Sequence, residues 1–282
     1  MHGLNFETHG SPVYRLYDRE GTEIAYDEAI DRLAGAEVVL FGELHDNTLI
    51  HQTQISMTED LYKKRKGELI LGAEMFEADN QLILDEYLAG LILHRHLVAE
   101  AKVWDNYETD YRVLVDFAKK HGLKFIATSI PRRYAGLVSR EGIKALDGLS
   151  GEAKQYIAPL PIAVALATPG YREMMEMNLD MGHGMQMNPE NLVAAQAVKD
   201  ATMAYFILKN RASKQLFLHF NGVYHSQNYG GIYWYLKKVA PELNVLALCA
   251  VEEESFEFQD EYKGLGDFIL VVPAAGPPPP RT

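Results

Sequence analysis

The chain has 282 residues, of which 48% are apolar and 23% are charged, a composition typical of a globular protein with one large domain or a core and a subdomain. Its 27 Lys and Arg residues against 39 Asp and Glu residues give a net charge of −12, which disfavours binding to nucleic acid or to an anionic lipid surface. The single cysteine, Cys249, excludes a disulfide within the chain, and no apolar run approaches the roughly 18 residues of a transmembrane helix.

Five short runs rich in Val, Ile, Leu and Phe predict buried strands, and segments with helical spacing of apolar residues separate them. An earlier stretch predicts a small hairpin that turns at Glu20 and Gly21. The alternation of strand and helix predicts an α/β fold with a three-layer core, in which helices flank a mostly parallel sheet on both faces. A ligand site is then expected at the carboxyl ends of the strands. The five runs span residues 36–42, 69–75, 124–129, 216–221 and 244–251.

The middle of the chain interrupts this alternation. From about residue 132 to residue 210, helix propensity is nearly continuous, and Asn188 followed by Pro189 marks the start of a long helix. We interpret this region as a helical insertion, or cap, within a single α/β domain that covers residues 1–275. Residues 276–282 contain four consecutive prolines and predict a polyproline-like tail that need not pack against the domain.

Two predicted strands each end in a histidine. The sequence FGELHDN places Glu43 and His45 on the same side of the chain, because side chains alternate along an extended backbone. The sequence NGVYHSQ repeats the G-x-x-H pattern with Gly222 and His225, and a third strand ends in GAEMFE, which contains Glu74. Since parallel strands end at the same edge of a sheet, we expect these side chains to converge there.

Carboxylates beside imidazoles can supply a general base with an orienting acid, or ligands for a divalent metal ion. One hypothesis is therefore a metal-dependent or His/Glu-based hydrolase, of esterase or protease type, in which Glu43, His45, Glu74 and His225 are catalytic or bind the metal. In the structural alternative, Glu43 caps a neighbouring backbone group and His45 is hydrogen-bonded within its turn. His219, earlier on the same strand as His225, is expected to be a core histidine with satisfied hydrogen bonds.

The insertion contains MMEMNLDMGHGMQMN, with six methionines and His183 within fifteen residues. Methionines at helical spacing usually fill a core, but the glycines that flank His183 favour an exposed imidazole suited to an axial ligand. Tyr171 begins this helical stretch and is the nearest candidate phenol ligand for ferric haem. Arg132 directly follows a predicted strand, where it is either solvated or placed to pair with a propionate.

Several segments together resemble the ChaN-like, iron-regulated haem-binding proteins over about residues 16–241. They are GELHDN with the following His51 and Gln54, GAEMFE, VWDNY, IPRR, Tyr171-Arg172 and AQAVKDATMA. That family is similar to a wider group, containing erythromycin esterases and the Tiki metalloproteases, that shares the paired G-x-x-H strand ends.

The resemblance implies a protein of haem and iron acquisition that binds haem through a tyrosine with a histidine nearby, on a surface that two subunits can share in a homodimer. Tyr171 and His183 match these positions, with Arg132 as the propionate partner. The wider group implies instead the hydrolase, with His45 as base or ligand and Glu43 as its orienting group. A third alternative is an interaction module that keeps the histidines only as structure. The resemblance leaves five other tyrosines open: Tyr107, Tyr111, Tyr134, Tyr224 and Tyr229.

Members of this family are generally exported and often lipid-anchored. The resemblance therefore implies a periplasmic protein or an outer-membrane lipoprotein, anchored through an N-terminal signal. The first residues, MHGLNFETHG, show neither a signal sequence nor a lipobox. A signal removed from the chain would leave the same sequence, so the start does not decide the compartment.

Overall fold

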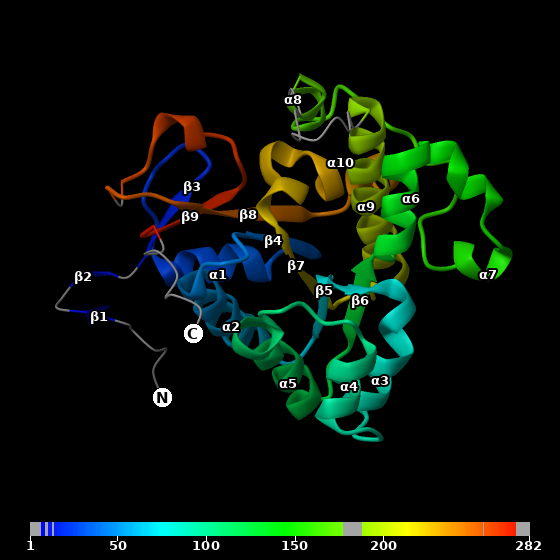
Figure 1. Cartoon of the computed structure of the whole chain (residues 1–282). Coiled ribbons are helices and arrows are strands. Elements are labelled where there is room, and N and C mark those ends of the chain that lie inside the picture. Colours follow the sequence, from blue (N-terminus) through cyan, green and yellow to red (C-terminus); the bar gives the residue numbers. More distant parts are fainter. Residues whose placement is uncertain (1–6, 9–10, 13, 177–187, 256, 275–282) are drawn as a thin grey trace, which may run out of the picture.

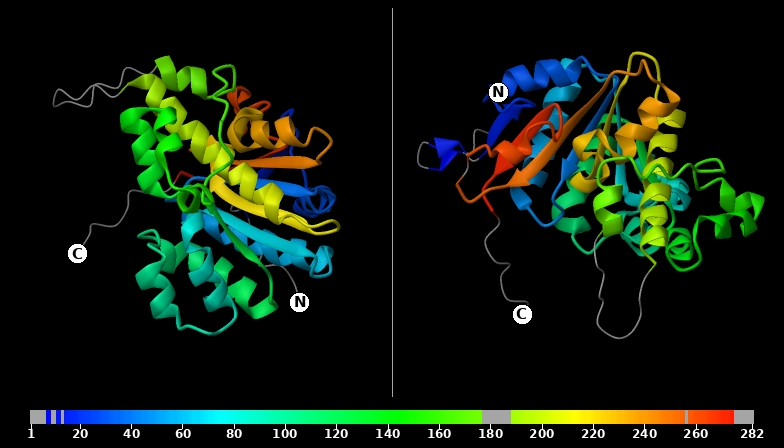
Figure 2. Two further views of the ribbon diagram at one scale, coloured as in Figure 1. Left: turned by 90° about the vertical axis from the view of Figure 1, so that its right-hand side faces the viewer. Right: turned by 90° about the horizontal axis from the view of Figure 1, so that it is seen from above.

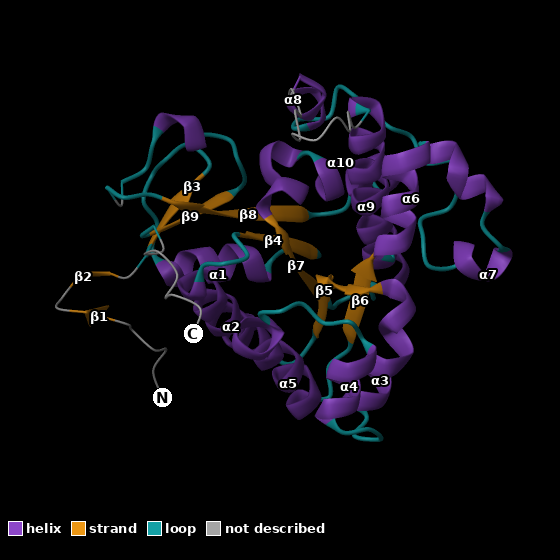
Figure 3. Ribbon diagram, viewed as in Figure 1, coloured by secondary structure: helices purple, strands orange, loops and turns teal. Residues whose placement is uncertain are grey.

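The computed structural model describes residues 7–8, 11–12, 14–176, 188–255 and 257–274 (Figure 1). Within these ranges, seven strands form one sheet in the order β3-β9-β8-β4-β7-β5-β6. All neighbouring strands in it are parallel except β3, which pairs antiparallel with β9. Helices cover both faces of this sheet (Figure 3), so the predicted α/β fold is confirmed.

The strands of the sheet include all five of the predicted runs. Strands β4, β5, β7 and β9 are buried along their whole length, which explains why their sequences are continuously apolar and do not alternate. The seven strands are β3 (Arg15–Asp18), β4 (Val38–Glu43), β5 (Leu69–Glu77), β6 (Phe125–Ser129), β7 (Leu216–Gly222), β8 (Val245–Glu252) and β9 (Phe268–Val272). A separate pair, β1 (Glu7–Thr8) and β2 (Ser11–Pro12), is antiparallel.

The predicted hairpin near Glu20 and Gly21 forms only in part. Tyr17 and Glu23 make an isolated antiparallel bridge across that turn. The main partner of β3 is instead β9, whose residues lie about 250 positions later in the chain. A local turn signal therefore predicted the reversal of the chain, but it could not identify the distant strand that completes the edge of the sheet.

Two groups of helices cover the two faces of the sheet. One face packs against α1 (Tyr26–Ala34), α2 (Thr48–Lys64), α3 (Gln81–Leu88), α4 (His94–Glu100) and α5 (Arg112–His121). The other face packs against α9 (Pro189–Asn210) and α10 (Gly231–Val239). In Figure 2 (left), α9 lies along one face of the sheet and α3 to α5 lie on the other.

The described part of the region predicted as an insertion is mostly helical, except for the irregular segment of residues 155–170 between α7 and α8. It contains α6 (Arg132–Glu141), α7 (Gly151–Lys154), α8 (Tyr171–Glu176) and α9, which begins at Pro189 and is capped by the Asn188 side chain as predicted. Apolar residues of α6 and of the first half of α9 form a cluster of their own, while residues of α9 from Ala201 onward pack on the sheet. The division into a domain with an insertion stays a prediction, and the proline-rich tail lies outside the described residues.

Candidate functional site

The carboxyl ends of three adjacent strands bring the predicted side chains together. Glu43, the last residue of β4, is aligned with Gly222, the last residue of β7. Glu74 lies on the neighbouring strand β5, just after its pairing with β7 ends, and its Oε2 accepts a hydrogen bond of 2.8 Å from the Gly222 backbone nitrogen. His45 and His225 follow β4 and β7 directly, so all four side chains lie at this edge of the sheet. Their roles stay predictions.

His45 is held by the buried carboxylate of Glu43. The His45 Nδ1 lies 2.7 Å from Glu43 Oε1, which also accepts a hydrogen bond of 2.6 Å from the Tyr111 hydroxyl. The Gln54 side-chain amide donates to the other oxygen, Oε2. Burial favours neutral His45, but the hydrogen bond and the charge of Glu43 outweigh this, so the pKa of His45 is raised. Since the carboxylate accepts from Nδ1, the Nε2 atom of neutral His45 keeps its lone pair.

The backbone of His45 is fixed as well. Its carbonyl oxygen accepts hydrogen bonds of 3.0 Å from His51 Nε2 and from the Asn106 side chain. The Trp104 ring contacts the His45 imidazole edge-on, with 4.8 Å between the ring centroids. Trp104 and Asn106 belong to the VWDNY segment, which entered the sequence analysis only through the family resemblance, and Tyr111 follows it. Their contacts hold His45 and its partner Glu43 in place.

His225 lies between two buried carboxylates. Its Nε2 is 3.1 Å from Glu74 Oε1, and its Nδ1 is paired with Asp200 Oδ1. Burial acts to lower the pKa of His225, but the neighbouring carboxylates of Glu74 and Asp200 outweigh burial and raise this pKa to about 10. In turn, the positive charge of His225 lowers the pKa of Glu74 to about 2, although burial alone would raise it. His225 is therefore a buried imidazolium whose two nitrogens both donate. The sequence analysis did not single out Asp200, an acidic residue on an otherwise largely apolar part of α9.

Gly222 makes room for His45 to lie against the backbone of β7. A Cβ atom at this position would lie 2.9 Å from His45 Nε2 and 3.6 Å from Glu74 Oε2. His45 therefore places its free nitrogen directly over the backbone of β7, beside the carboxylate that holds His225. This close approach explains why the second G-x-x-H segment begins with glycine.

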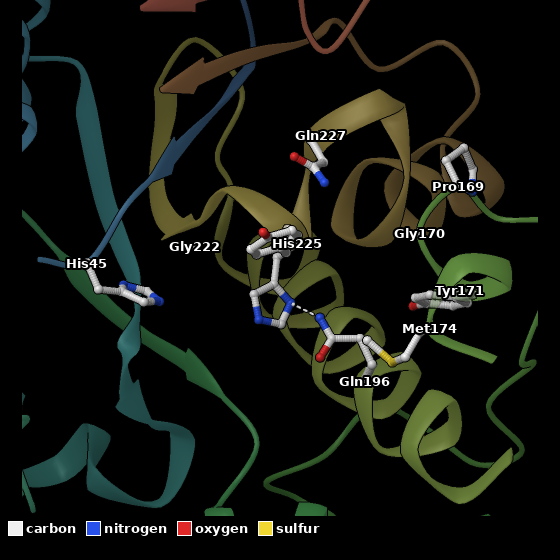
Figure 4. A pocket seen from close by; sticks show the side chains of 10 residues that line it. His45, Pro169, Gly170, Tyr171, Met174, Gln196, Gly222, His225 and Gln227 are labelled. Atoms are coloured by element: carbon white, nitrogen blue, oxygen red, sulfur yellow. Dashed lines mark hydrogen bonds between the residues drawn. The ribbon is translucent and has the colours of Figure 1, made fainter. Parts of the chain in front are cut away.

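A cavity of about 260 Å³ opens beside the histidines (Figure 4). His45 lies on one side of it, and Tyr171, Met174 and Pro169, which precede or belong to α8, lie on the other. A second cavity of about 280 Å³ also contains His45 and Gly222 in its lining. Tyr224, whose side chain is 77% exposed, contributes to both cavities.

A family model described as "Haem-binding uptake, Tiki superfamily, ChaN" matches residues 29–236. The chain belongs to this family. Among solved structures, "Cofacial heme binding to ChaN of Campylobacter jejuni" matches with a TM-score of 0.69 and 17% identity, covering 92% of this chain and 96% of that one. The type III effector HopBA1 matches with a TM-score of 0.46 and 11% identity, covering 88% and 92%. A comparison with curated protein sequences found no match.

The structure places two of the three ChaN-family residues that the sequence analysis assigned to haem, while His183 lies outside the described residues. Tyr171 lines the first cavity, but its side chain is only 3% exposed and its hydroxyl donates a hydrogen bond of 2.6 Å to Asp200 Oδ2. Burial and the Asp200 charge raise the pKa of Tyr171. The Arg132 guanidinium is 66% exposed and lies 3.4 Å from Glu77 Oε1 and 5.8 Å from the centre of the Trp104 ring.

The other tyrosines differ widely in exposure. Tyr107 and Tyr111 are buried, Tyr134 and Tyr229 are partly exposed, and Tyr224 is exposed at the mouth of the cavities. Only Tyr224 therefore combines an accessible phenol with a place in the site, among these five alternatives.

The geometry also bears on the expected core role of His219 and on the metal-site hypothesis. His219 is fully buried, contacts Thr128 Oγ1 at 2.7 Å and Asn221 Oδ1 at 3.1 Å, and has a pKa lowered by burial to about 4; it is a core histidine as expected. Among the described residues, no cluster of three or more His, Cys, Asp or Glu side chains has the arrangement of a metal site. The metal hypothesis gains no support, since both nitrogens of His225 already donate to carboxylates.

Within the described part of the chain, no helix is both long and apolar enough to cross a bilayer.

Proposed function

We propose that this protein binds haem at the carboxyl edge of its sheet and serves in haem or iron acquisition. Membership of the ChaN haem-uptake family supports this proposal, as does the similarity of fold to a ChaN protein described by cofacial haem binding. The observation that carries it is the cavity beside His45, whose far wall combines Tyr171, Met174 and Pro169. Apolar and sulfur-containing walls suit the faces of a porphyrin, and a phenol can bind ferric iron.

The size of the cavity bears on how haem would be held. At about 260 Å³ it is smaller than the roughly 300–1,000 Å³ of most small-molecule pockets, so it would enclose only part of a porphyrin. The second cavity shares His45, Gly222 and Tyr224 with the first, so the two cavities adjoin. Haem would then lie partly exposed between these two cavities, which supports our proposal that a second subunit covers it in a homodimer.

We propose Tyr171 as the iron ligand, with His183 nearby and Tyr224 as the alternative. Iron ligation requires a phenolate, and the Tyr171 proton now lies in a hydrogen bond to Asp200. Ligation through Tyr171 must therefore disrupt this bond, whereas Tyr224 has no such cost because its side chain is exposed. Arg132 is accessible to a propionate, although it would have to leave or share its contact with Glu77. As a member of an uptake family, the protein is proposed to act outside the cytoplasm, as a periplasmic protein or a lipoprotein.

An absorbance titration with ferric haem, combined with size-exclusion chromatography, tests the proposal. We expect a saturable Soret shift and a change from monomer to dimer. Tyr171→Phe should change the Soret position and weaken binding by roughly tenfold or more, since even residues behind the ligands change metal affinity by about 10- to 100-fold. Tyr224→Phe is the competing variant, and Tyr134→Phe is the control outside both cavities.

The titrations distinguish haem binding itself from the choice of the iron ligand. A featureless titration of the wild-type protein would overturn haem binding itself. A normal titration in which only Tyr224→Phe alters the spectrum would move the ligand to Tyr224 and leave haem binding in place. If both variants behave like the wild type, neither tyrosine binds the iron.

A second candidate function, hydrolysis of an ester or amide, is supported by the orientation of His45. Glu43 fixes Nδ1, while Nε2 lies over Gly222 at the cavity, where it can take a proton from water as that water attacks a carbonyl carbon. The proton then passes to the leaving group when the carbon–oxygen or carbon–nitrogen bond breaks.

A panel of small esters and amides tests this candidate in the haem-free protein. If hydrolysis is detected, His45→Gln should lower kcat by about 10²- to 10⁴-fold, the usual contribution of a general base. His96→Gln, on an exposed position of α4, is the matched control. Turnover that survives His45→Gln would exclude His45 as the base.

A further inference from the structure

A third cavity, of about 320 Å³, lies on a different side of α9 from the histidines. Its walls come from α9, from α10 and from the segment that follows α7, residues 158–163. Gln196 and Asp200 of α9 contact His225, whereas Ala201, Ala204 and Leu208 contribute to this cavity. The cavity is thus separate from the candidate haem site.

The lining of this cavity is almost entirely apolar. Its inner wall includes the buried residues Ala158, Ala201 and Ala204, whose small side chains leave the space open. The hydroxyl of Tyr235, also in the lining, already donates a hydrogen bond of 2.6 Å to the Ala163 carbonyl oxygen. Among the residues that the structure describes, no acidic side chain belongs to the lining. An apolar group would therefore enter without displacing polar contacts.

One cation lies at the opening. Lys238 and Val239 are the exposed end of the lining on α10, where the Val239 side chain is 70% exposed. The Lys238 ammonium lies 4.7 Å from the centre of the Trp234 ring and forms no ion pair with any carboxylate of the described residues. In a chain with a net charge of −12, a lysine at the edge of an apolar cavity with no acidic residue among its described lining would favour a ligand with an anionic head group over a cationic one.

We propose that this cavity binds the hydrocarbon chain of a fatty acid, with the carboxylate at Lys238. The cavity is walled by α9, α10 and residues 158–163, and its volume of about 320 Å³ is near the lower end of the range for small-molecule pockets, about 300 Å³, which suits a single hydrocarbon chain. This favours an acid of medium chain length. The carboxylate remains near solvent, where the flexible lysine side chain can reach it.

Calorimetric titration of the haem-free protein with decanoate, kept below its micellar concentration, tests the proposal. We expect saturation at one equivalent of decanoate. Lys238→Gln should weaken the binding of decanoate about two- to fivefold, the range for an exposed ion pair, and should leave the binding of decanol unchanged. Ala204→Leu, which fills the inner wall, should abolish binding of both ligands. Ala163→Phe narrows the cavity from an exposed position and serves as a second variant in case Ala204→Leu fails to fold.

The controls separate this site from non-specific binding. Lys144→Gln removes a charge elsewhere on the surface and should leave decanoate binding unchanged. The proposal fails if decanoate does not bind, if Ala204→Leu and Ala163→Phe both fold and still bind it normally, or if decylammonium binds as tightly as decanoate. Normal haem binding by these variants would confirm that the two sites are independent.

Discussion

Replacing His225 by asparagine is expected to lower the free energy of unfolding by about 3–5 kcal/mol, measured by urea denaturation, because it leaves Glu74 and Asp200 buried without their shared cation. The expected loss is this large because both carboxylates lose a charged hydrogen bond, not because the ion pairs themselves are strongly stabilising. In a Glu74→Gln background, His225→Asn should lower the free energy of unfolding by less, because only the Asp200 carboxylate is then left without its cation. Asparagine at His96, which is exposed, provides the control.

The loss should also depend on pH. Because the pKa of His225 is raised from 6.5 to about 10, its contribution is complete below about pH 6.5 and disappears as the pH rises through about 10. The contribution of Glu74, whose pKa is lowered from 4.5 to about 2, is present above about pH 4.5 and disappears as the pH falls through about 2. The difference between wild type and His225→Asn should therefore be greatest at about pH 4.5–6.5. A difference that stayed constant from pH 6 to pH 10 would contradict this account.

Gly231→Ala is expected to destabilise the protein by about 2–5 kcal/mol and to displace His225. Gly231 has φ of +47°, a conformation that costs an L-residue roughly 1–2 kcal/mol, and its new Cβ would collide with the His225 carbonyl oxygen. It would also lie 3.1 Å from Asp200 Oδ2. Since backbone must move to relieve the collision, a further 1–3 kcal/mol, roughly, is expected from overpacking.

Gly264→Ala is a matched control for this substitution. Gly264 has φ of +78°, but a Cβ there would have no atom within 4 Å, so only the conformational cost of about 1–2 kcal/mol applies. Thermal and urea unfolding give the two losses, and the imidazole NMR signals of His225 show whether its pKa falls in the Gly231 variant. Equal losses in the two variants would mean that the contact with His225 has no effect on stability.

The sequence predicted the strands that carry the site because β4, β5 and β7 are buried on both faces, which makes them continuously apolar. It missed β9, although FILVV is equally apolar, because no α-helix separates β9 from β8 and the expected alternation is absent there. The stretch that forms β3 was predicted as one arm of a local hairpin, but its pairing with β9 could not be predicted from the turn, since β9 lies at the other end of the chain.

The site was predicted in outline by the same reasoning. The alternation of side chains along a strand and the repeated G-x-x-H pattern were enough to predict that Glu43, His45, Glu74 and His225 lie at the carboxyl edge of the sheet. The side chains that set the charge states of these four residues could not be identified as such. Asp200 lies on α9, and Tyr111 ends the π-helical segment Tyr107–Tyr111 directly before α5, so strand periodicity gives no information about either residue. Likewise, burial of Tyr171 against Asp200 depends on how α8 packs on α9, which no local pattern specifies.

The order of strands in the sheet has a consequence for biosynthesis. β4 lies between β7 and β8, so both of its neighbours in the sheet are synthesised more than 170 residues after it. For the same reason, His225 is synthesised 180 residues after His45. Such pairings close long loops and are intrinsically slow to form. During translation, the first half of the chain would expose both edges of β4 to the solvent. Nascent chains arrested before β7 should therefore bind chaperones and resist haem loading until the last third of the protein has emerged from the ribosome.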